Sequence, residues 1–312
     1  MSVIEVNHLT KDYGSGCGVF DVSFKVEKGE VFGFLGPNGA GKSTTIRHLM
    51  GFSKPQSGET KIFEKETFDR YSEILGNVGY IPGEIALPTG LTGWEFIRMM
   101  QNLQHKKNEE KLNEMLTLFK LDDTALRGET KKMSLGVKRK LAVVTAFMGD
   151  PDVLILDEPT SGLDPVMQQT FIDYVKKEKE KGKTILLSSH IFSEVDATCD
   201  RIAIIKDGKI VSEFVANDLK HASNKYYEIY FASQKDYDDF MAKAKTKKDI
   251  LEVLNSDKDR YYAYISTDDK NINEVIDLLA GYEMKGFDNK KETLEDYFMK
   301  FYKEDKDFGG AL

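Results

Sequence analysis

The sequence contains little cysteine and carries no excess of positive charge. Only Cys17 and Cys199 occur among 312 residues, and because they stand alone and far apart we interpret both as reduced thiols rather than as a disulfide or a metal pair. Acidic residues outnumber basic ones by 52 to 44, which gives a net charge of −8. This balance argues against a broad nucleic-acid-binding surface, so no nucleic acid is expected among the partners.

Long apolar segments are also lacking. No run approaches the roughly 18 consecutive apolar residues of a membrane-spanning helix, and Met1–Thr10 lacks the charged-then-apolar pattern of a secretory signal. The apolar content of 40% is still typical of a chain that folds around a core, and the length suits one large or two ordinary domains. These features predict a cytoplasmic protein that acts at a membrane only through a partner.

The most informative segment present is the glycine-rich GPNGAGKST at Gly36–Thr44. It matches the pattern G-x-x-x-x-G-K-S/T, follows an apolar run at Val31–Leu35 and precedes a helix-compatible run at Thr45–Met50, a context that disfavours a chance glycine-rich turn. In such a loop, successive backbone N–H groups surround phosphate oxygens. Lys42 is expected to reach the β- and γ-phosphates, and Ser43 to ligate Mg²⁺. The predicted nucleotide-binding residues of this loop are Gly36, Pro37, Asn38, Gly39, Ala40, Gly41, Lys42, Ser43 and Thr44.

A second motif, VLILDEPTSGLD at Val153–Asp164, places two carboxylates at the end of an apolar strand. Asp157 is positioned to hold Mg²⁺, directly or through water. Glu158 follows at once and is the candidate general base that polarises the attacking water. Two acids at this place could instead be a helix cap or a surface pair, but the apolar lead-in and the upstream phosphate loop favour the catalytic interpretation.

These motifs together resemble those of the ABC ATPases, the nucleotide-binding subunits of ABC transporters, over Met1 to about Val215. GPNGAGKST is similar to the Walker A motif, VLILDE to Walker B, and SGLD, with Asp164, to the D-loop. The resemblance implies that Tyr13 stacks on adenine and that His190 is the switch histidine at the γ-phosphate. Taken alone, Tyr13 would more often be a packing residue and His190 a structural one.

The resemblance also implies a homodimer in which two chains pair head to tail around two ATP molecules. Each ATP would meet the Walker A loop of one subunit and the signature motif of the other. The signature here is MSLGV at Met133–Val137, which departs from the usual LSGGQ at Leu135 and Val137. Ser134 and Gly136 are retained, and they can supply a hydroxyl and a backbone N–H at a helix N-terminus.

A further departure affects the glutamine of the family's Q-loop. The matching position in Tyr80–Glu84 is Gly83, which has no side chain to reach Mg²⁺ or water. We hypothesise that Glu84 takes this role through a water molecule. The Mg²⁺ ligands expected from the sequence are therefore Ser43, Asp157 and Glu84.

The order of predicted elements indicates an α/β fold with two domains. Residues 1–219 are expected to form a P-loop NTPase core of the ABC ATPase type, with an antiparallel β subdomain and an inserted helical subdomain at about 84–150. A capping box at Thr92–Glu95 is expected to begin one of its helices. Residues 220–312 are expected to form a small α+β domain, whose β-α-β-β-α-β order suits a ferredoxin-like topology.

The resemblance implies an ATPase that powers export through a separate membrane permease, bound peripherally at the cytoplasmic face of the membrane. Its strongest support is KKETLEDYFMKFYK at Lys290–Lys303, which looks like the ending of bacterial drug, antibiotic and bacteriocin exporter ATPases. The predicted permease contact is Tyr80–Leu91 with the Trp94–Leu103 face, although core packing explains Trp94 equally well. The transported cargo is not specified by this chain.

Two other function classes stay open. Importer ATPases often carry a β-barrel tail, which the mixed tail expected here does not resemble. Soluble ABC proteins that act on ribosomes carry two nucleotide domains, and those that act on DNA carry long coiled coils. The interval Thr45–Asp152 shows no sustained heptads.

Overall fold

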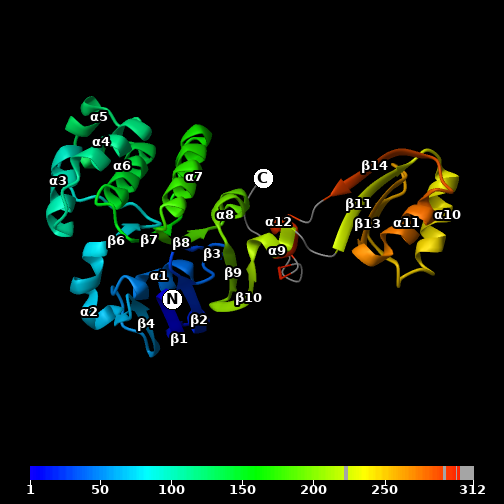
Figure 1. Cartoon of the computed structure of the whole chain (residues 1–312), viewed down its shortest axis with the longest axis horizontal. Helices are drawn as coiled ribbons and strands as arrows, with labels where there is room; N and C mark the ends of the chain where they lie inside the picture. The colour runs from blue at the N-terminus through cyan, green and yellow to red at the C-terminus, as the bar shows by residue number, and fades with distance from the viewer. Residues whose placement is uncertain (221–223, 291–292, 300, 303–312) are drawn as a thin grey trace. The chain divides into compact units, whose positions relative to one another are not determined.

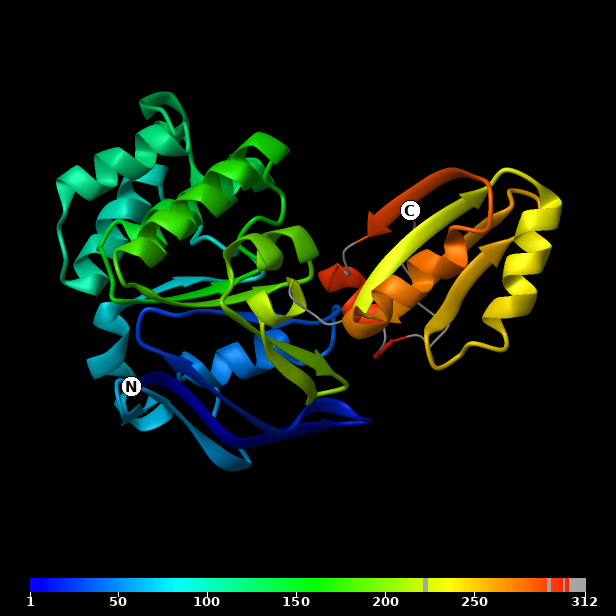
Figure 2. The same ribbon diagram turned by 45° about the vertical axis from the view of Figure 1, so that its right-hand side comes forward.

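The computed structural model describes residues 1–220, 224–290, 293–299 and 301–302. The chain divides into two compact units, Met1–Ala216 and Asn217–Leu312, and the division falls inside helix α9 (Ala216–Lys220). Figure 1 labels most helices and strands of both units, and Figure 2 shows them from a second direction.

A six-stranded sheet of order β10-β9-β3-β8-β7-β6 forms the centre of the first unit. Its strands are β3 (Val31–Leu35), β6 (Val78–Ile81), β7 (Val153–Asp157), β8 (Thr184–Ser189), β9 (Arg201–Lys206) and the antiparallel edge strand β10 (Lys209–Val215). Strands β3, β7 and β8 are buried along their whole length, as expected for parallel strands covered on both faces. Because Leu35 pairs with Ser189 and Asp157 pairs with Ser188, the carboxyl ends of these three strands meet at one edge.

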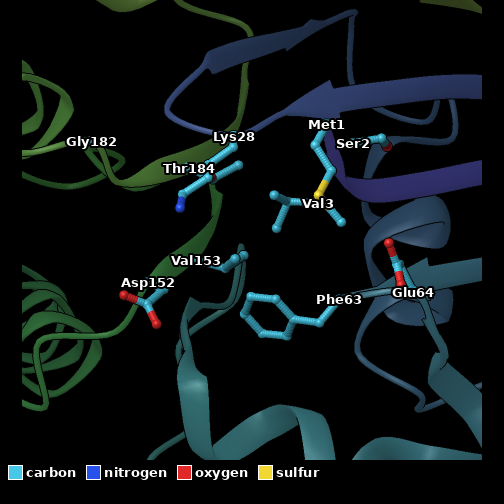
Figure 3. A pocket seen from close by; sticks show the side chains of 10 residues that line it. All are labelled: Met1, Ser2, Val3, Lys28, Phe63, Glu64, Asp152, Val153, Gly182 and Thr184. Carbon is cyan, nitrogen blue, oxygen red and sulfur yellow. The ribbon is translucent and has the colours of Figure 1, made fainter.

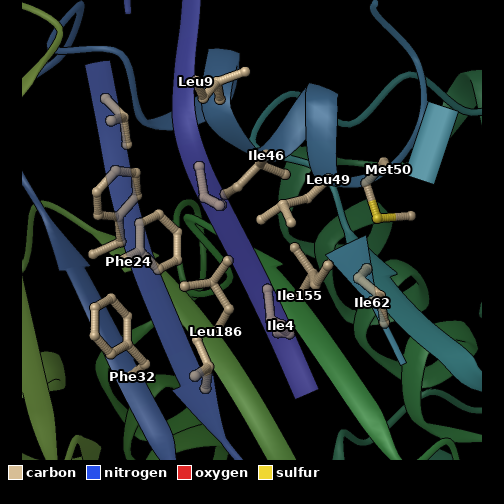
Figure 4. Close-up of a cluster of buried hydrophobic side chains, with 14 of the residues drawn as sticks. Ile4, Leu9, Phe24, Phe32, Ile46, Leu49, Met50, Ile62, Ile155 and Leu186 are labelled. Atoms are coloured by element: carbon tan, nitrogen blue, oxygen red, sulfur yellow. The ribbon is translucent and has the colours of Figure 1, made fainter. Parts of the chain in front are cut away.

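A second, antiparallel sheet has the order β2-β1-β4-β5. It consists of β1 (Ser2–Gly14), β2 (Cys17–Glu27), β4 (Ser57–Ile62) and β5 (Lys65–Glu66). Figure 4 shows side chains of this sheet, of helix α1 (Lys42–Leu49) and of the parallel strands meeting in one apolar cluster. The rings of Phe24 and Phe32 stack there with their centroids 5.1 Å apart. The cluster fixes α1, and with it the loop before α1, between the two sheets.

Helices surround the parallel sheet, and four of them follow one another between β6 and β7. These four are α3 (Gly93–Gln104), α4 (Glu109–Leu118), α5 (Asp123–Arg127) and α6 (Leu135–Phe147). The capping box predicted for α3 is confirmed, because Thr92 Oγ1 accepts from Glu95 N and the Glu95 carboxylate accepts from Thr92 N. The remaining elements of the unit are α2 (Thr67–Ile74), α7 (Pro165–Glu180), α8 (Phe192–Thr198) and the 3-10 turns η1 (Leu75–Asn77) and η2 (Thr130–Lys132).

The second unit is a four-stranded antiparallel sheet of order β12-β13-β11-β14 with two helices packed on it. Its core includes Ile229, Phe240, Ile265 and Val275. The elements are β11 (Asn224–Phe231), α10 (Gln234–Ala244), β12 (Leu251–Asp257), β13 (Tyr262–Asp268), η3 (Asp269–Asn271), α11 (Ile272–Leu279), β14 (Met284–Lys290) and α12 (Leu294–Met299). The ferredoxin-like assignment stays a prediction.

In the exporter-like segment, Lys291, Glu292, Lys300 and Lys303 lie outside the described residues. Among the residues that are described, no helix combines the length and the apolar character needed to cross a membrane.

Candidate active site

The loop between β3 and α1 has the tight backbone that the glycine-rich motif predicts. A Cβ atom at Gly36 would lie 2.6 Å from the carbonyl oxygen of Ile205, so the close approach to β9 requires glycine. Gly39 and Gly41 have φ angles of 83° and 110°, which residues with side chains rarely adopt. The fold therefore depends on glycine at three of the predicted nucleotide-binding positions.

Lys42 is folded back over this loop and is only 5% exposed. Its Nζ donates to the carbonyl oxygens of Gly36, at 2.6 Å, and Pro37, at 3.2 Å. The same Nζ lies 3.2 Å from Glu158 Oε1. A cation is thus fixed inside the loop, where a phosphate oxygen can replace the carboxylate as its partner.

Glu158 contacts both Lys42 of the phosphate loop and the end of strand β8. Its backbone has a left-handed φ of 48°, an unusual conformation for a residue with a side chain, and its N–H donates to Ser188 O at 2.9 Å. Its Oε2 lies 2.6 Å from His190 Nδ1. Glu158 therefore contacts both other predicted catalytic residues, Lys42 and His190, although the three are far apart in the sequence.

Asp157 ends strand β7 and is 2% exposed. Its Oδ1 accepts from Ser188 Oγ at 2.8 Å. Burial raises the pKa of the Asp157 carboxyl, hydrogen bonds from Ser43 and Ser188 oppose this, and the nearby charge of Glu158 adds to it. Ser43 and Asp157 thus present neighbouring oxygen ligands, the type that Mg²⁺ prefers.

The two predicted Q-loop residues behave differently. A Cβ atom at Gly83 would lie 2.9 Å from Asp157 Oδ2, so the absence of a side chain lets the backbone pass directly beside that carboxylate. Glu84 is exposed and makes no hydrogen bond or ion pair with any other described residue. The structure does not bring Glu84 into contact with Asp157, and its role as a Mg²⁺ ligand stays a prediction.

Three further predicted site residues, Tyr13, Ser134 and Asp164, lie on the surface. Tyr13, on β1, is 55% exposed, with Lys11 Nζ 5.8 Å from its ring centroid. Ser134 caps α6 by accepting from Val137 N at 3.3 Å, and Asp164 caps α7 by accepting from Met167 N at 3.0 Å. The two motifs are closely packed, since a Cβ atom at Gly136 would lie 3.2 Å from Gly162 O.

Two buried charged residues next to these loops are absent from the sequence prediction. Arg139, on α6, donates to main-chain carbonyls of the Q-loop, at Pro82 and Gly83, and of the D-loop, at Ser161. Glu194, on α8, is 1% exposed and accepts from Ser189 Oγ at 2.7 Å and Thr160 Oγ1 at 3.3 Å. Burial raises the pKa of Glu194 to about 7. Arg139 could have been noticed as a charged residue that leads into the apolar run LAVV.

A separate cavity of about 380 Å³ lies at the opposite, amino-terminal ends of β7 and β8. Figure 3 shows the apolar side chains of Met1, Val3 and Phe63 on one side of it. The charged side chains of Asp152 and Lys28 lie on another side. It contains none of the predicted site residues. The nucleotide chemistry is therefore assigned to the carboxyl ends of the strands, where ligands of open α/β sheets bind.

Comparison with known proteins agrees with this arrangement. A family profile described as ABC transporter matches residues 19–161. The bacitracin transport ATP-binding protein BcrA of Bacillus licheniformis is 35% identical over 306 residues, covering 96% of this chain and 97% of the relative. A solved ATP-binding subunit of an ABC transporter has a TM-score of 0.65 at 31% identity, covering 70% of this chain and 92% of that one. A dimeric ATP-binding cassette in a post-hydrolysis state with ADP and Pi shares the fold, with a TM-score of 0.63 at 24% identity over 68% of this chain and 98% of that one.

Proposed function

Because this chain belongs to the ATP-binding proteins of ABC transporters, we propose that its ATPase activity powers export through a separate membrane permease. Like the family, it binds and hydrolyses ATP. The observation that carries the proposal is that Glu158, next to the buried Asp157, contacts both the buried Lys42 and the exposed His190. The similarity to a bacitracin transport protein along nearly the whole chain supports export.

Each group in the cluster has a distinct part in the proposed hydrolysis. Glu158 orients and polarises water for in-line attack on the γ-phosphoryl group. Lys42 and the loop N–H groups neutralise the charge that develops on the phosphoryl oxygens. His190, held by Glu158, contacts the γ-phosphate, and Tyr13 stacks on the adenine. The remaining positive contact would come from the helix N-terminus at Ser134 of the partner subunit.

The residues present fit a Mg²⁺ ion. Among the described residues no group of three or more His, Cys, Asp or Glu forms a metal site, so an ion here would be held by Ser43, Asp157 and phosphate oxygens, as is common for Mg²⁺. When bound, Mg²⁺ supplies charge neutralisation at the β- and γ-phosphates. We keep Glu84 as a third, water-mediated ligand. Full ATPase activity and full transport by Glu84→Ala would end that part of the proposal.

We further propose that the chain acts as a head-to-tail homodimer, peripherally bound at the cytoplasmic face of the membrane. The exposed positions of Ser134 and Asp164 and the partly exposed position of Gly136 support this, because motifs that complete a partner's site must be accessible. The dimeric cassette of the same fold supports it as well. ATP would favour the closed pair, and product release would separate it.

The proposed permease contact includes a groove of about 650 Å³ between α3, α4 and α5. Trp94 lies at this groove, and its Nε1 donates to Asp123 Oδ1 at 2.8 Å. Arg98 is exposed on the same helix, and the buried Gln101 Nε2 has no hydrogen-bond partner among the described residues. The donors of Arg98 and Gln101 at this groove could therefore bind a docked segment that offers carbonyl or carboxylate oxygens.

The decisive experiment is a pull-down of tagged Glu158→Gln from gently solubilised native cells with ATP and Mg²⁺. Slow hydrolysis holds partners in place, so one multi-span membrane protein should be recovered in stoichiometric amount. An added Arg98→Glu change should reduce that recovery without lowering ATP binding. Recovery of ribosomes or DNA with no membrane protein would overturn the transporter proposal and favour a soluble factor.

A further inference from the structure

Arg139 is a charged residue in the interior of the first unit. It lies on α6, is 2% exposed, and is among the largest fully buried side chains of the described residues. Its guanidinium donates through all three nitrogens. Nη1 donates to Pro82 O at 2.9 Å, Nη2 to Gly83 O at 2.8 Å, and Nε to Ser161 O at 2.9 Å.

All three acceptors are main-chain carbonyls of the two loops that flank the catalytic carboxylates. Gly83 lies on one side, where its backbone passes directly beside Asp157 Oδ2. Ser161 lies on the other side, and its N–H donates to Glu158 O at 3.2 Å. One rigid, planar group therefore sets the spacing of the backbone on both sides of Asp157 and Glu158.

The charge of Arg139 is compensated by those same carboxylates at longer range. Arg139 forms no ion pair with any described residue, and burial lowers the pKa of its guanidinium, while the charges of Asp157 and Glu158 act to raise it. A guanidinium stays charged in proteins, so a buried one must keep its hydrogen-bond acceptors. If either loop moved away, the cation would lose acceptors, and movement of α6 and of the loops is therefore coupled.

We propose that Arg139 is a positioning residue that couples the signature end of α6 to the catalytic carboxylates of the same chain. Helix α6 begins directly after Ser134, five positions before Arg139 in the sequence. This inference rests on the proposed head-to-tail homodimer, in which Ser134 and Gly136 serve the ATP of the partner while Asp157 and Glu158 serve the chain's own ATP. Arg139 then transmits the engagement of one ATP site to the other.

Gly83 explains why this coupling falls to a residue of α6. A glutamine side chain at position 83 could reach the metal site directly, but glycine offers only its carbonyl oxygen. That carbonyl accepts from Arg139 Nη2. The Q-loop of this chain is thus held through its backbone.

The first test measures steady-state ATPase activity of the full chain as Arg139→Met and Arg139→Lys. Arg139→Met should lower kcat by about 10- to 100-fold while KM for ATP changes by less than about threefold, because carboxylate positions shift and the phosphate loop does not. Arg139→Lys keeps the charge but not the fork of donors, so it should fall in between. The matched control is Lys140→Met, which removes a charge at the next position of α6, where the side chain makes no hydrogen bond or ion pair with a described residue.

The second test uses hydrogen exchange in the Glu158→Gln background, so that activity is not the readout. ATP should protect segments 78–91 and 158–164 when the dimer forms, and adding Arg139→Met should remove that protection while size-exclusion chromatography still shows the dimer. Segment 36–50 should be unchanged. Should Arg139→Met fail to fold, Arg139→Lys is measured in the same way and decides the question.

The outcomes separate this inference from the proposed function. If Glu158→Gln does not dimerise with ATP, the head-to-tail pairing fails, whatever Arg139 does. If the dimer forms and protection in 78–91 and 158–164 survives the Arg139 substitution, or if kcat stays within about twofold of the unmodified chain, the coupling role of Arg139 is wrong.

Discussion

The two halves of the proposed ATP site are built in different ways. The cluster of Lys42, Asp157 and Glu158 is largely buried, and its members are hydrogen-bonded or ion-paired within one chain. Ser134 and Asp164 are exposed, and among the described residues their side chains only cap α6 and α7. The difference teaches that the hydrolytic geometry is preorganised inside the chain, and it predicts that the surface half acts only when a second copy is present.

The largest effect is expected inside the buried half. Glu158→Gln should bind ATP but lower kcat roughly 10²- to 10⁴-fold, because an amide cannot accept a proton from water. Loss of the charge next to Lys42 Nζ should also strengthen ATP binding, since phosphate no longer competes with a carboxylate for that cation. Rapid-quench kinetics and fluorescent-nucleotide titration measure the two quantities. Near-normal turnover would show that Glu158 is not the base.

A mixing experiment tests the exposed half. Lys42→Ala and Ser134→Arg homodimers should both be inactive, but a head-to-tail heterodimer of the two regains one intact site out of two. With random mixing, activity should return to roughly a quarter of the unmodified level. The measurement is ATPase activity as a function of the mixing ratio. If the mixture were as inactive as its components, Lys42 and Ser134 would have to act within one chain, and the exposed half would not serve a partner's ATP.

The packing of Gly83 against Asp157 gives an intermediate effect. Gly83→Ala places a methyl group where only 2.9 Å separates a Cβ from Asp157 Oδ2, so the carboxylate or the loop must shift. We expect about a tenfold loss of kcat and a higher Mg²⁺ requirement, measured by titrating Mg²⁺ at saturating ATP. Gly76→Ala is the matched control, since the Cβ contact there is an ordinary 4.0 Å. Equal activity of the two variants would contradict this account.

Some elements of the fold could be predicted from the sequence, and others could not. Strands β3 and β7, the glycine-rich loop and the α3 capping box follow from local residue patterns, because each is determined by neighbours in the chain. Helix α2 has no counterpart among the predicted elements, and its Arg70 has non-helical angles that interrupt any regular pattern.

The role of Arg139 could not be predicted, for a different reason. Its acceptors are main-chain carbonyls 22, 56 and 57 positions away, and a carbonyl oxygen leaves no mark in the sequence. Glu194 is similar, since its contact with Thr160 depends on how α8 packs beside the D-loop. The chemistry of the site was predictable from motifs, whereas the groups that hold the motifs together required the fold.

The smallest effect is expected at Glu194, which links the D-loop to the strand end before His190. Burial disfavours the charged form and raises the pKa of the Glu194 carboxyl to about 7 in the folded chain, from 4.5 for an unperturbed glutamate. Between about pH 4.5 and pH 7, the folded state therefore keeps a proton on Glu194 that the unfolded state has already released. Stability is therefore fully retained below about pH 4.5 and falls, by about 3 kcal/mol in all, as pH rises to about 7.

Glu194→Gln has no proton to lose, so it should remove this pH dependence. The two melting temperatures should be closest near pH 5, and that of Glu194→Gln should be higher by several degrees at pH 8, because only the carboxylate has to be buried with a charge there. Glu213→Gln, at an exposed ion pair with Arg201, controls for general charge effects. Calorimetric scans from pH 5 to 8 measure the difference. If the melting temperatures of Glu194→Gln and of the unmodified chain changed in parallel with pH, Glu194 would be ionised in the folded state. The link between the D-loop and the strand end would then be a buried carboxylate and not a neutral acid.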